Sequence, residues 1–128
     1  MADLAPFARF LGISVLLHSP ERSEAELKVR EDLLNRRGVM HGGALMALAD
    51  TLGGMTARIG LAAGQGTATI ESKTNFFAAV TQGETVRAVC MPLHRGRTTI
   101  VLETRITRSD GKLAAIVTQT QLVLDGRG

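Results

Sequence analysis

The segment that most constrains this chain is a proline-free apolar run from His41 to about Leu61. Residues 44–49 consist of Ala, Leu and Met, which are strong helix formers. Nearly every side of the resulting helix is apolar, so the pattern predicts a long helix that is buried all round. Asp50 stands in its middle, and an isolated buried carboxylate is costly unless it is paired or used. We therefore interpret Asp50 as a candidate functional residue.

A polar, glycine-rich loop from Asn35 to Gly43 precedes this helix. The backbone N–H groups of Gly42 and Gly43 fall at the helix start, where donors lack intrahelical partners and the dipole is positive. Such an end stabilises an oxyanion. Asp50 follows Gly42 by about two turns, roughly 12 Å, which is too far for both to act on one carbonyl. If both serve one reaction, Asp50 must face the helix start of a second chain, which predicts a homodimer as the minimal active unit.

The remainder of the chain has the pattern of short strands joined by tight turns. Strands are predicted over residues 13–19, 24–30, 68–75, 86–93, 100–106 and 113–124, and a short helix precedes the first strand. Strict alternation over 68–75 places Thr69, Glu71 and Lys73 on one face. Gly53 and Gly54 each cost the long helix ~1 kcal/mol relative to Ala, which indicates close approach of a neighbouring element. The order predicts an α+β fold, an antiparallel sheet wrapped around one long central helix, as a single domain over 1–128.

Composition excludes several classes of function. The chain has no Trp or Tyr and four Phe, so stacking platforms for nucleic acid are not expected. Asp50 and Arg58 interrupt the apolar run, so no transmembrane segment is predicted. Residues 1–6 lack the features of a signal peptide, and the single cysteine, Cys90, permits no internal disulfide. We therefore expect a cytoplasmic protein in which Cys90 is a buried structural thiol.

The charged residues give two further indications. No histidines or cysteines have metal-ligand spacing, so no metal site is expected. The net charge is +3 and the sequence pI about 9.8, which fits either a solvated basic surface or a polyanionic ligand such as a nucleotide-bearing thioester.

Two motifs carry a family resemblance: Asn35…Gly38…His41-Gly42-Gly43…Leu48…Asp50…Gly53, and the segment Thr69-Ile70-Glu71-Ser72-Lys73-Thr74-Asn75-Phe76. With them the chain resembles the hotdog-fold acyl-CoA thioesterases, most closely the phenylacetate-pathway and 4-hydroxybenzoyl-CoA thioesterase branch. The similarity extends over nearly the whole chain. It implies the hotdog fold and hydrolysis of an acyl thioester, aryl or phenylacetyl-type in that branch, to a free acid and coenzyme A.

The resemblance also implies roles for individual residues. Asp50 matches the catalytic carboxylate, as general base on water or as nucleophile, and Gly42 matches the N–H that polarises the thioester carbonyl. His41 and Asn35 match the polar pair that shapes the loop and orients the carbonyl or the water. Thr69 matches a hydroxyl residue that in some members of the family helps hold the attacking water. Asp50 and Thr69 of one subunit would then meet the other three residues of its partner.

The substrate contacts and the exact reaction are less constrained. Gly43 adds an N–H at the helix start, and Lys73, Arg95 and Arg97 are candidates to hold the phosphates of coenzyme A, with exposed surface charge as the alternative. Because coenzyme A is part of the substrate, no separate cofactor is implied. Homodimers are expected to pair into a homotetramer. Two alternatives are a hotdog enoyl- or hydroxyacyl-thioester hydratase-dehydratase, which needs a histidine at the reacting carbon, and a non-enzymatic acyl-CoA-binding module.

Overall fold

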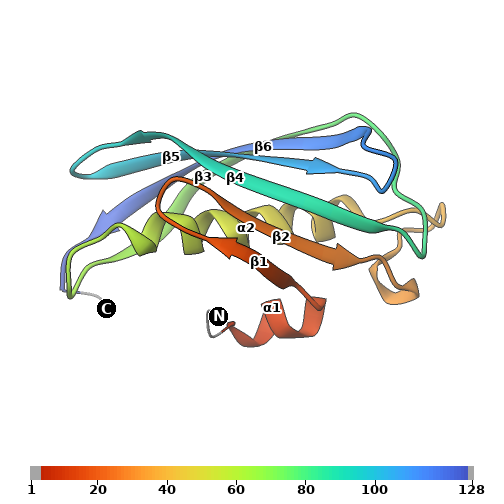
Figure 1. Ribbon diagram of the computed structural model, residues 1–128, viewed down its shortest axis with the longest axis horizontal. Coiled ribbons are helices and arrows are strands. Elements are labelled where there is room, and N and C mark those ends of the chain that lie inside the picture. Colours follow the sequence, from red (N-terminus) through yellow and green to blue (C-terminus); the bar gives the residue numbers. More distant parts are fainter. Residues whose placement is uncertain (1–3, 127–128) are drawn as a thin grey trace.

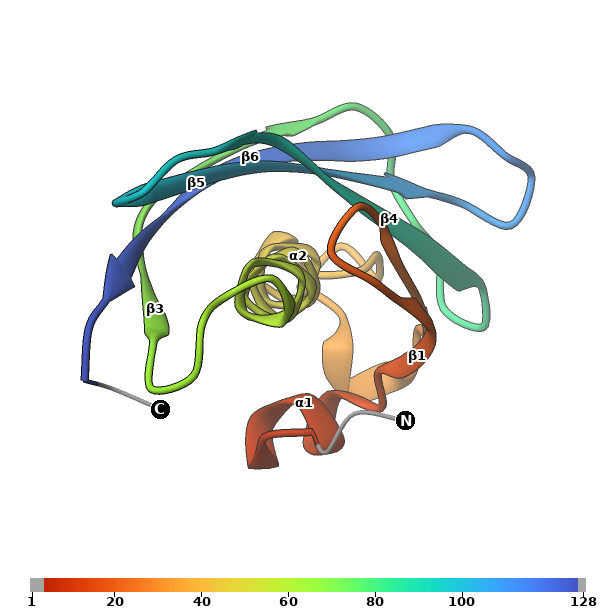
Figure 2. The same ribbon diagram turned by 60° about the vertical axis from the view of Figure 1, so that its left-hand side comes forward.

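The computed structural model describes residues 4–126 as one curved sheet and three helical segments (Figure 1). The elements in chain order are α1 (Pro6–Leu11), β1 (Ser14–His18), β2 (Ser23–Lys28), the 3-10 helix η1 (Glu31–Leu33), α2 (Gly42–Ile59), β3 (Gly66–Phe76), β4 (Thr85–Arg95), β5 (Thr99–Thr107) and β6 (Leu113–Leu124). The six strands form an antiparallel sheet in the order β1-β2-β4-β5-β6-β3. Figure 2 shows the sheet arching over α2, with α1 beneath the open side of the arch. This confirms the predicted α+β hotdog architecture.

The core lies between α2 and the concave face of the sheet. Leu48 and Leu52 of the helix are fully buried and belong to one apolar cluster with Leu102 and Ile106 of β5, which are fully buried as well. Cys90 is also fully buried, and this burial raises the pKa of its thiol. The prediction of a structural thiol is therefore confirmed.

The prediction that α2 is buried all round is wrong for the single chain. The sheet covers only part of the circumference of the helix, and its free side exposes Gly43, Met46, Asp50 and Arg58. Alanine and methionine on this side made the helix look apolar in every direction, although their side chains are not covered. No helix within residues 4–126 is long and apolar enough to span a lipid bilayer.

Strand β3 forms one edge of the sheet. It pairs with β6 on one side and with no strand of residues 4–126 on the other. Most of its residues are exposed, including Ile70 at 56 % and Phe76 at 53 %. An edge strand of 11 residues with exposed apolar side chains is an unusual feature for an isolated chain, because it offers unpaired backbone groups to another strand.

A β-bulge interrupts the pairing of β3 with β6. Thr69 lies opposite Gln121 and Glu71 lies opposite Thr120, so Ile70 is an extra residue in β3. The strict alternation predicted over residues 68–75 is therefore wrong at this position. Thr69 and Ser72 both face α2, whereas Glu71 and Lys73 face the convex side of the sheet.

Candidate functional site

The start of α2 presents one free backbone donor. His41 is the N-cap residue, and its Nδ1 accepts the N–H of Gly43 at 2.8 Å. A neutral ring in this role carries its proton on Nε2, which is then free to donate to another group. No acceptor within residues 4–126 bonds the N–H of Gly42. The free N–H at the positive end of the helix is therefore that of Gly42, because His41 occupies that of Gly43.

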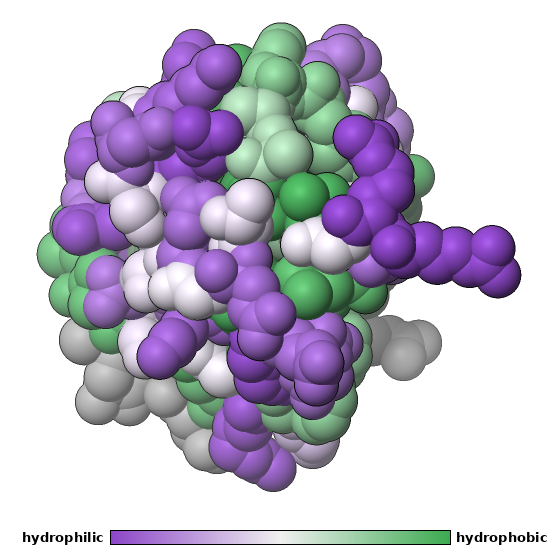
Figure 3. Space-filling model, turned by 90° about the vertical axis from the view of Figure 1, so that its right-hand side faces the viewer, coloured by the Kyte–Doolittle hydropathy of each residue, from purple (hydrophilic) through white to green (hydrophobic). Residues whose placement is uncertain are grey.

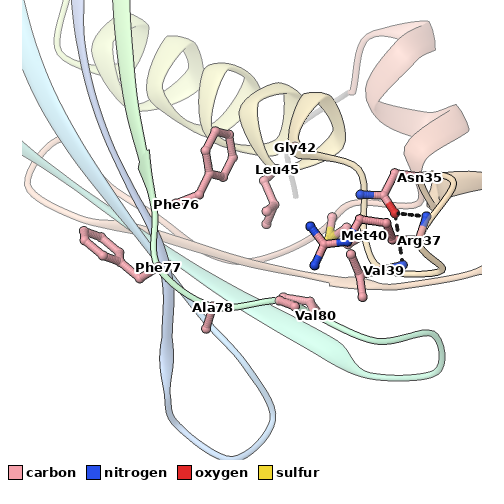
Figure 4. Close-up of a pocket in the computed structure, with 11 residues that line it drawn as sticks. Asn35, Arg37, Val39, Met40, Gly42, Leu45, Phe76, Phe77, Ala78 and Val80 are labelled. Atoms are coloured by element: carbon pink, nitrogen blue, oxygen red, sulfur yellow. Dashed lines mark hydrogen bonds between the residues drawn. The ribbon is translucent and has the colours of Figure 1, made fainter.

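Asn35 fixes the loop that leads into this helix. Its Oδ1 accepts the N–H of Arg37 at 2.9 Å and that of Val39 at 3.3 Å, as Figure 4 shows. The backbone of Asn35 also closes the loop by donating its N–H to the carbonyl of Val39 at 2.8 Å. These contacts agree with the loop-shaping role implied for Asn35.

A cavity of about 350 Å³ opens beside the helix start (Figure 4). Its lining is mainly apolar, with Gly42, Leu45 and Phe76 on one side and Met40 and Val80 on another. A methyl group at Gly42 would lie 3.1 Å from Cζ of Phe76, so glycine at this position lets the ring approach the helix end. Figure 3 views the molecule from this end and shows apolar surface surrounded by hydrophilic side chains. Arg37 also lines the cavity, and the sequence analysis did not single it out.

Asp50 and Thr69 form the second half of the site. The hydroxyl of Thr69 donates to Oδ1 of Asp50 at 2.8 Å. The bulge at Ile70 makes this contact possible, because it turns Thr69 toward the helix. Asp50 is exposed in the single chain, and two hollows adjoin it. Arg58 lines one of these hollows together with Asp50 and Thr69.

Two buried glutamines lie beneath this pair and were missed in the sequence analysis. Gln121 Nε2 donates to Oγ1 of Thr69 at 2.6 Å and also to Oε1 of Gln119. Gln119 Nε2 in turn donates to the carbonyl of Ala49 at 3.1 Å. Both side chains are at most 1 % exposed. The alternation along β6 could have revealed them. Positions 117, 119 and 121 share its inward face, and glutamine is unusual there because apolar residues are the rule.

The three basic residues proposed for phosphate binding have different surroundings. Lys73 projects from the convex side of β3, and Arg97 is exposed in the β4–β5 turn. Arg95 has a different role: its guanidinium donates to the carbonyls of Thr56 at 2.7 Å and Ala57 at 3.1 Å near the end of α2, and to Pro20 at 2.9 Å. Because these bonds cap the helix end, phosphate binding is not retained for Arg95.

The two halves of the site are separated within one chain. Gly42 and Asp50 lie on the same helix, roughly 12 Å apart by its rise per residue, and different hollows adjoin them. Among residues 4–126 no three His, Cys, Asp or Glu side chains are grouped as metal ligands would be. The arrangement offers a hydrogen-bonded carboxylate in one place and an oxyanion donor in another.

Comparisons with known proteins identify chains of the same kind. A family model described as the thioesterase superfamily matches residues 37–115. The proofreading thioesterase EntH of Cronobacter turicensis is 39 % identical over 87 residues, which are 68 % of this chain and 63 % of that protein. The chain thus matches less than two thirds of the length of that relative.

Solved structures show the same architecture. Thioesterase HI1161 from Haemophilus influenzae superposes with a TM-score of 0.87 at 27 % identity, covering 93 % of this chain and 82 % of that one. A hypothetical thioesterase from Streptococcus pneumoniae, solved with coenzyme A, gives a TM-score of 0.83 at 26 % identity, covering 91 % and 88 %.

Proposed function

Because this chain belongs to the thioesterase superfamily, we propose that it hydrolyses an acyl-coenzyme A thioester to a free acid and coenzyme A. The observation that carries this proposal is the exposed Asp50 carboxylate, bonded to Thr69 at mid-helix, on a chain whose helix start has a free N–H at Gly42. The similar Streptococcus pneumoniae protein, whose structure contains coenzyme A, supports the choice of thiol carrier.

The chemistry requires few groups. Asp50 takes a proton from water while the water oxygen attacks the thioester carbonyl carbon, and the N–H of Gly42 stabilises the resulting oxyanion. The C–S bond then breaks, and coenzyme A leaves as a thiolate that needs no strong acid, because the thiol pKa is ~8.5. Direct attack by Asp50 on the carbonyl is the alternative route. Thr69 holds the carboxylate in place in either case.

We propose that the active site is shared between two copies of the chain. Asp50 and Thr69 of one copy would face Asn35, His41 and Gly42 of the other, since one helix cannot bring both sets to one carbonyl. The exposed edge of β3 supports this arrangement, because pairing with a second copy would cover Ile70 and its free backbone groups. Leu93, which is 60 % exposed on β4, is a candidate contact for the further pairing of dimers into a tetramer.

The substrate has an acyl part and a nucleotide part. The apolar cavity beside Gly42 suits an aryl or phenylacetyl-type group, in agreement with the branch that the sequence resembles. Arg37 lines that cavity and is our first candidate for a phosphate of coenzyme A, while Lys73 and Arg97 remain candidates. A cytoplasmic location also remains a prediction.

Release of free thiol from a panel of acyl-CoAs tests this function. The panel contains benzoyl-, phenylacetyl- and straight-chain acyl-CoAs, and Asp50→Ala should lower kcat by roughly 10²-fold or more. The matched control is Glu71→Ala, because Glu71 lies on the same strand as Thr69 but faces the opposite side of the sheet. Its kcat should stay within about twofold of wild type, as is usual for an exposed residue outside the site.

The other two candidate functions give different results in this assay. A hydratase-dehydratase would change the absorbance of an enoyl-CoA without releasing thiol, and a binding module would do neither. Thiol release that persists in Asp50→Ala would contradict the role proposed for this carboxylate.

A further inference from the structure

The two buried glutamines under Asp50 form a chain of hydrogen bonds whose direction is fixed at one end. The carbonyl of Ala49 can only accept, so the amide nitrogen of Gln119 must face it. The oxygen of Gln119 then faces Gln121 and can only accept, so the amide nitrogen of Gln121 must face Gln119. The orientation of both amides therefore follows from a backbone carbonyl of α2.

The directions of the next two hydrogen bonds, at Thr69 and Asp50, are fixed in the same way. The nitrogen of Gln121 also reaches Thr69, so Oγ1 of Thr69 is an acceptor in that bond. Its own proton is left to donate, and Oδ1 of Asp50 is the acceptor at 2.8 Å. The oxygen that accepts this bond, Oδ1, therefore carries no proton in this arrangement. Oδ1 is thereby occupied, and Oδ2 is left for another partner.

The helix is shaped to admit these amides. A methyl group at Gly53 would lie 2.5 Å from Cδ of Gln119, which no packed structure accommodates. Two fully buried amides at positions where apolar side chains are usual destabilise the fold unless all their hydrogen bonds are made. The core under Asp50 therefore contains a row of hydrogen-bonded polar side chains in place of apolar packing, and this row ends at the Asp50 carboxylate.

We propose that Gln121 and Gln119 are positioning residues for hydrolysis: they orient the Thr69 hydroxyl so that it holds Oδ1 of the Asp50 carboxylate and leaves Oδ2 for the attacking water. This inference rests on the proposed function of Asp50. In this proposal Gln121 affects hydrolysis by orienting Thr69, whereas a glutamine that only fills the core would affect the stability of the fold and nothing else.

The test is a double-mutant cycle in the intact protein. Gln121→Met keeps a similar shape and removes the donors, and should lower kcat about tenfold or more with KM within about twofold. Thr69→Val should have a similar effect, and Thr69→Ser should restore most of the activity. Because Gln121 acts through Thr69, Gln121→Met should cause no further loss in the Thr69→Val protein. Losses that multiply would overturn the proposal.

Two controls separate positioning from packing. Thr104→Val changes an equally buried polar side chain on β5 outside this chain of bonds, and should leave kcat within about twofold. The free energy of unfolding of Gln121→Met and Thr104→Val is the second control, because a glutamine that only fills the core would change stability without changing kcat.

A measurement on the wild-type core covers the case in which Gln121→Met does not fold. The side-chain amide protons of Gln121 should exchange slowly by NMR and shift in Thr69→Val, whereas those of the exposed Gln82 should exchange fast and stay unchanged. Gln121 amide protons that behave like those of Gln82 would overturn the proposal.

The Asp50→Asn variant distinguishes failure of the proposed function from failure of this inference. If Asp50→Asn keeps full activity, the proposed function fails. If it is inactive while Gln121→Met is near wild type, only the inference about the glutamines fails.

Discussion

At the scale of the residue, Gly53 and Gly54 are adjacent glycines with different surroundings. Gly53 is buried against Gln119, whereas the nearest atom to a methyl group at Gly54 is Nη1 at the end of the exposed Arg58 side chain, at 3.4 Å. We expect Gly53→Ala to lower the free energy of unfolding by roughly 1–3 kcal/mol, because Gln119 is bonded and cannot move aside. Gly54→Ala should raise it by up to about 1 kcal/mol through helix propensity. Denaturant unfolding measures both; equal effects would contradict the packing described here.

Arg37 and Arg36 form a second matched pair. Arg37 lines the cavity beside Gly42, and Arg36 is an exposed neighbour that does not. Arg37→Ala should raise KM for an acyl-CoA roughly fivefold, through loss of a charge-assisted phosphate contact, while Arg36→Ala should not. For the same acyl group on N-acetylcysteamine, which has no phosphate, both variants should match wild type. A fivefold rise with both thioesters would assign Arg37 to the acyl group instead.

The sequence predicted the separate residues of the site better than their contacts. Gly42 and Asp50 were identified from their places on one helix, and His41 through the family resemblance. The structure puts His41 and Gly42 at the helix start and Asp50 on its exposed side. The contact of Thr69 with Asp50 depends on a bulge, which an alternation pattern cannot reveal because a bulge breaks the period. Gln121 was missed because burial of an amide depends on partners from distant segments of the chain.

At the scale of the element, Glu24 ties two strands together. On β2 it accepts hydrogen bonds from Arg87 of β4 and from Arg22, and these bonds lower the pKa of its carboxyl below the ordinary value of 4.5. A lowered folded-state pKa stabilises the protein above the unfolded value and ceases to do so as the pH falls through the folded one.

Glu24→Gln should therefore be less stable than wild type by about 0.5–1 kcal/mol at pH 7. The difference should shrink as the pH falls below 4.5 and through the lowered pKa of the folded wild-type carboxyl, which then also becomes neutral. Thermal unfolding of both proteins from pH 7 to pH 3 measures it. Glu26→Gln, on the same face of β2, is the control. A gap between wild type and Glu24→Gln that widens in acid would contradict this account of the β2–β4 contact.

Helices and strands were predicted well where the spacing of apolar residues kept a single period along the whole segment. The succession of strands along the chain and the central helix followed from alternation and from a proline-free apolar run. The order of the strands within the sheet was not predicted. The exposure of one side of α2 did not follow, because a sequence does not show how far a sheet curls. The guanidinium of Arg95 likewise looked free in the sequence, since its acceptors belong to the far end of α2 and to Pro20.

At the scale of the whole molecule, the proposed shared site predicts complementation between two inactive variants. Asp50→Ala breaks the carboxylate half in every site, and His41→Ala breaks the helix-start half. In a mixed dimer one of the two sites regains both intact halves. Mixing equal amounts after subunit exchange should therefore restore about one quarter of wild-type thiol release, since about half of the dimers are mixed. No recovery, with exchange shown by native mass spectrometry, would assign both halves to one chain.

The extra residue at position 70 has a consequence for how relatives of this chain are aligned. Upstream of it, odd-numbered positions of β3 point to the helix; downstream, even-numbered positions do. An alignment that moves a one-residue gap across this point would exchange the lining of the hollow with the outer surface, although the identity score would barely change. When residues that line the hollow are assigned from an alignment of such chains, segments 66–69 and 71–76 should therefore be aligned separately, each with its own alternation of inward and outward positions.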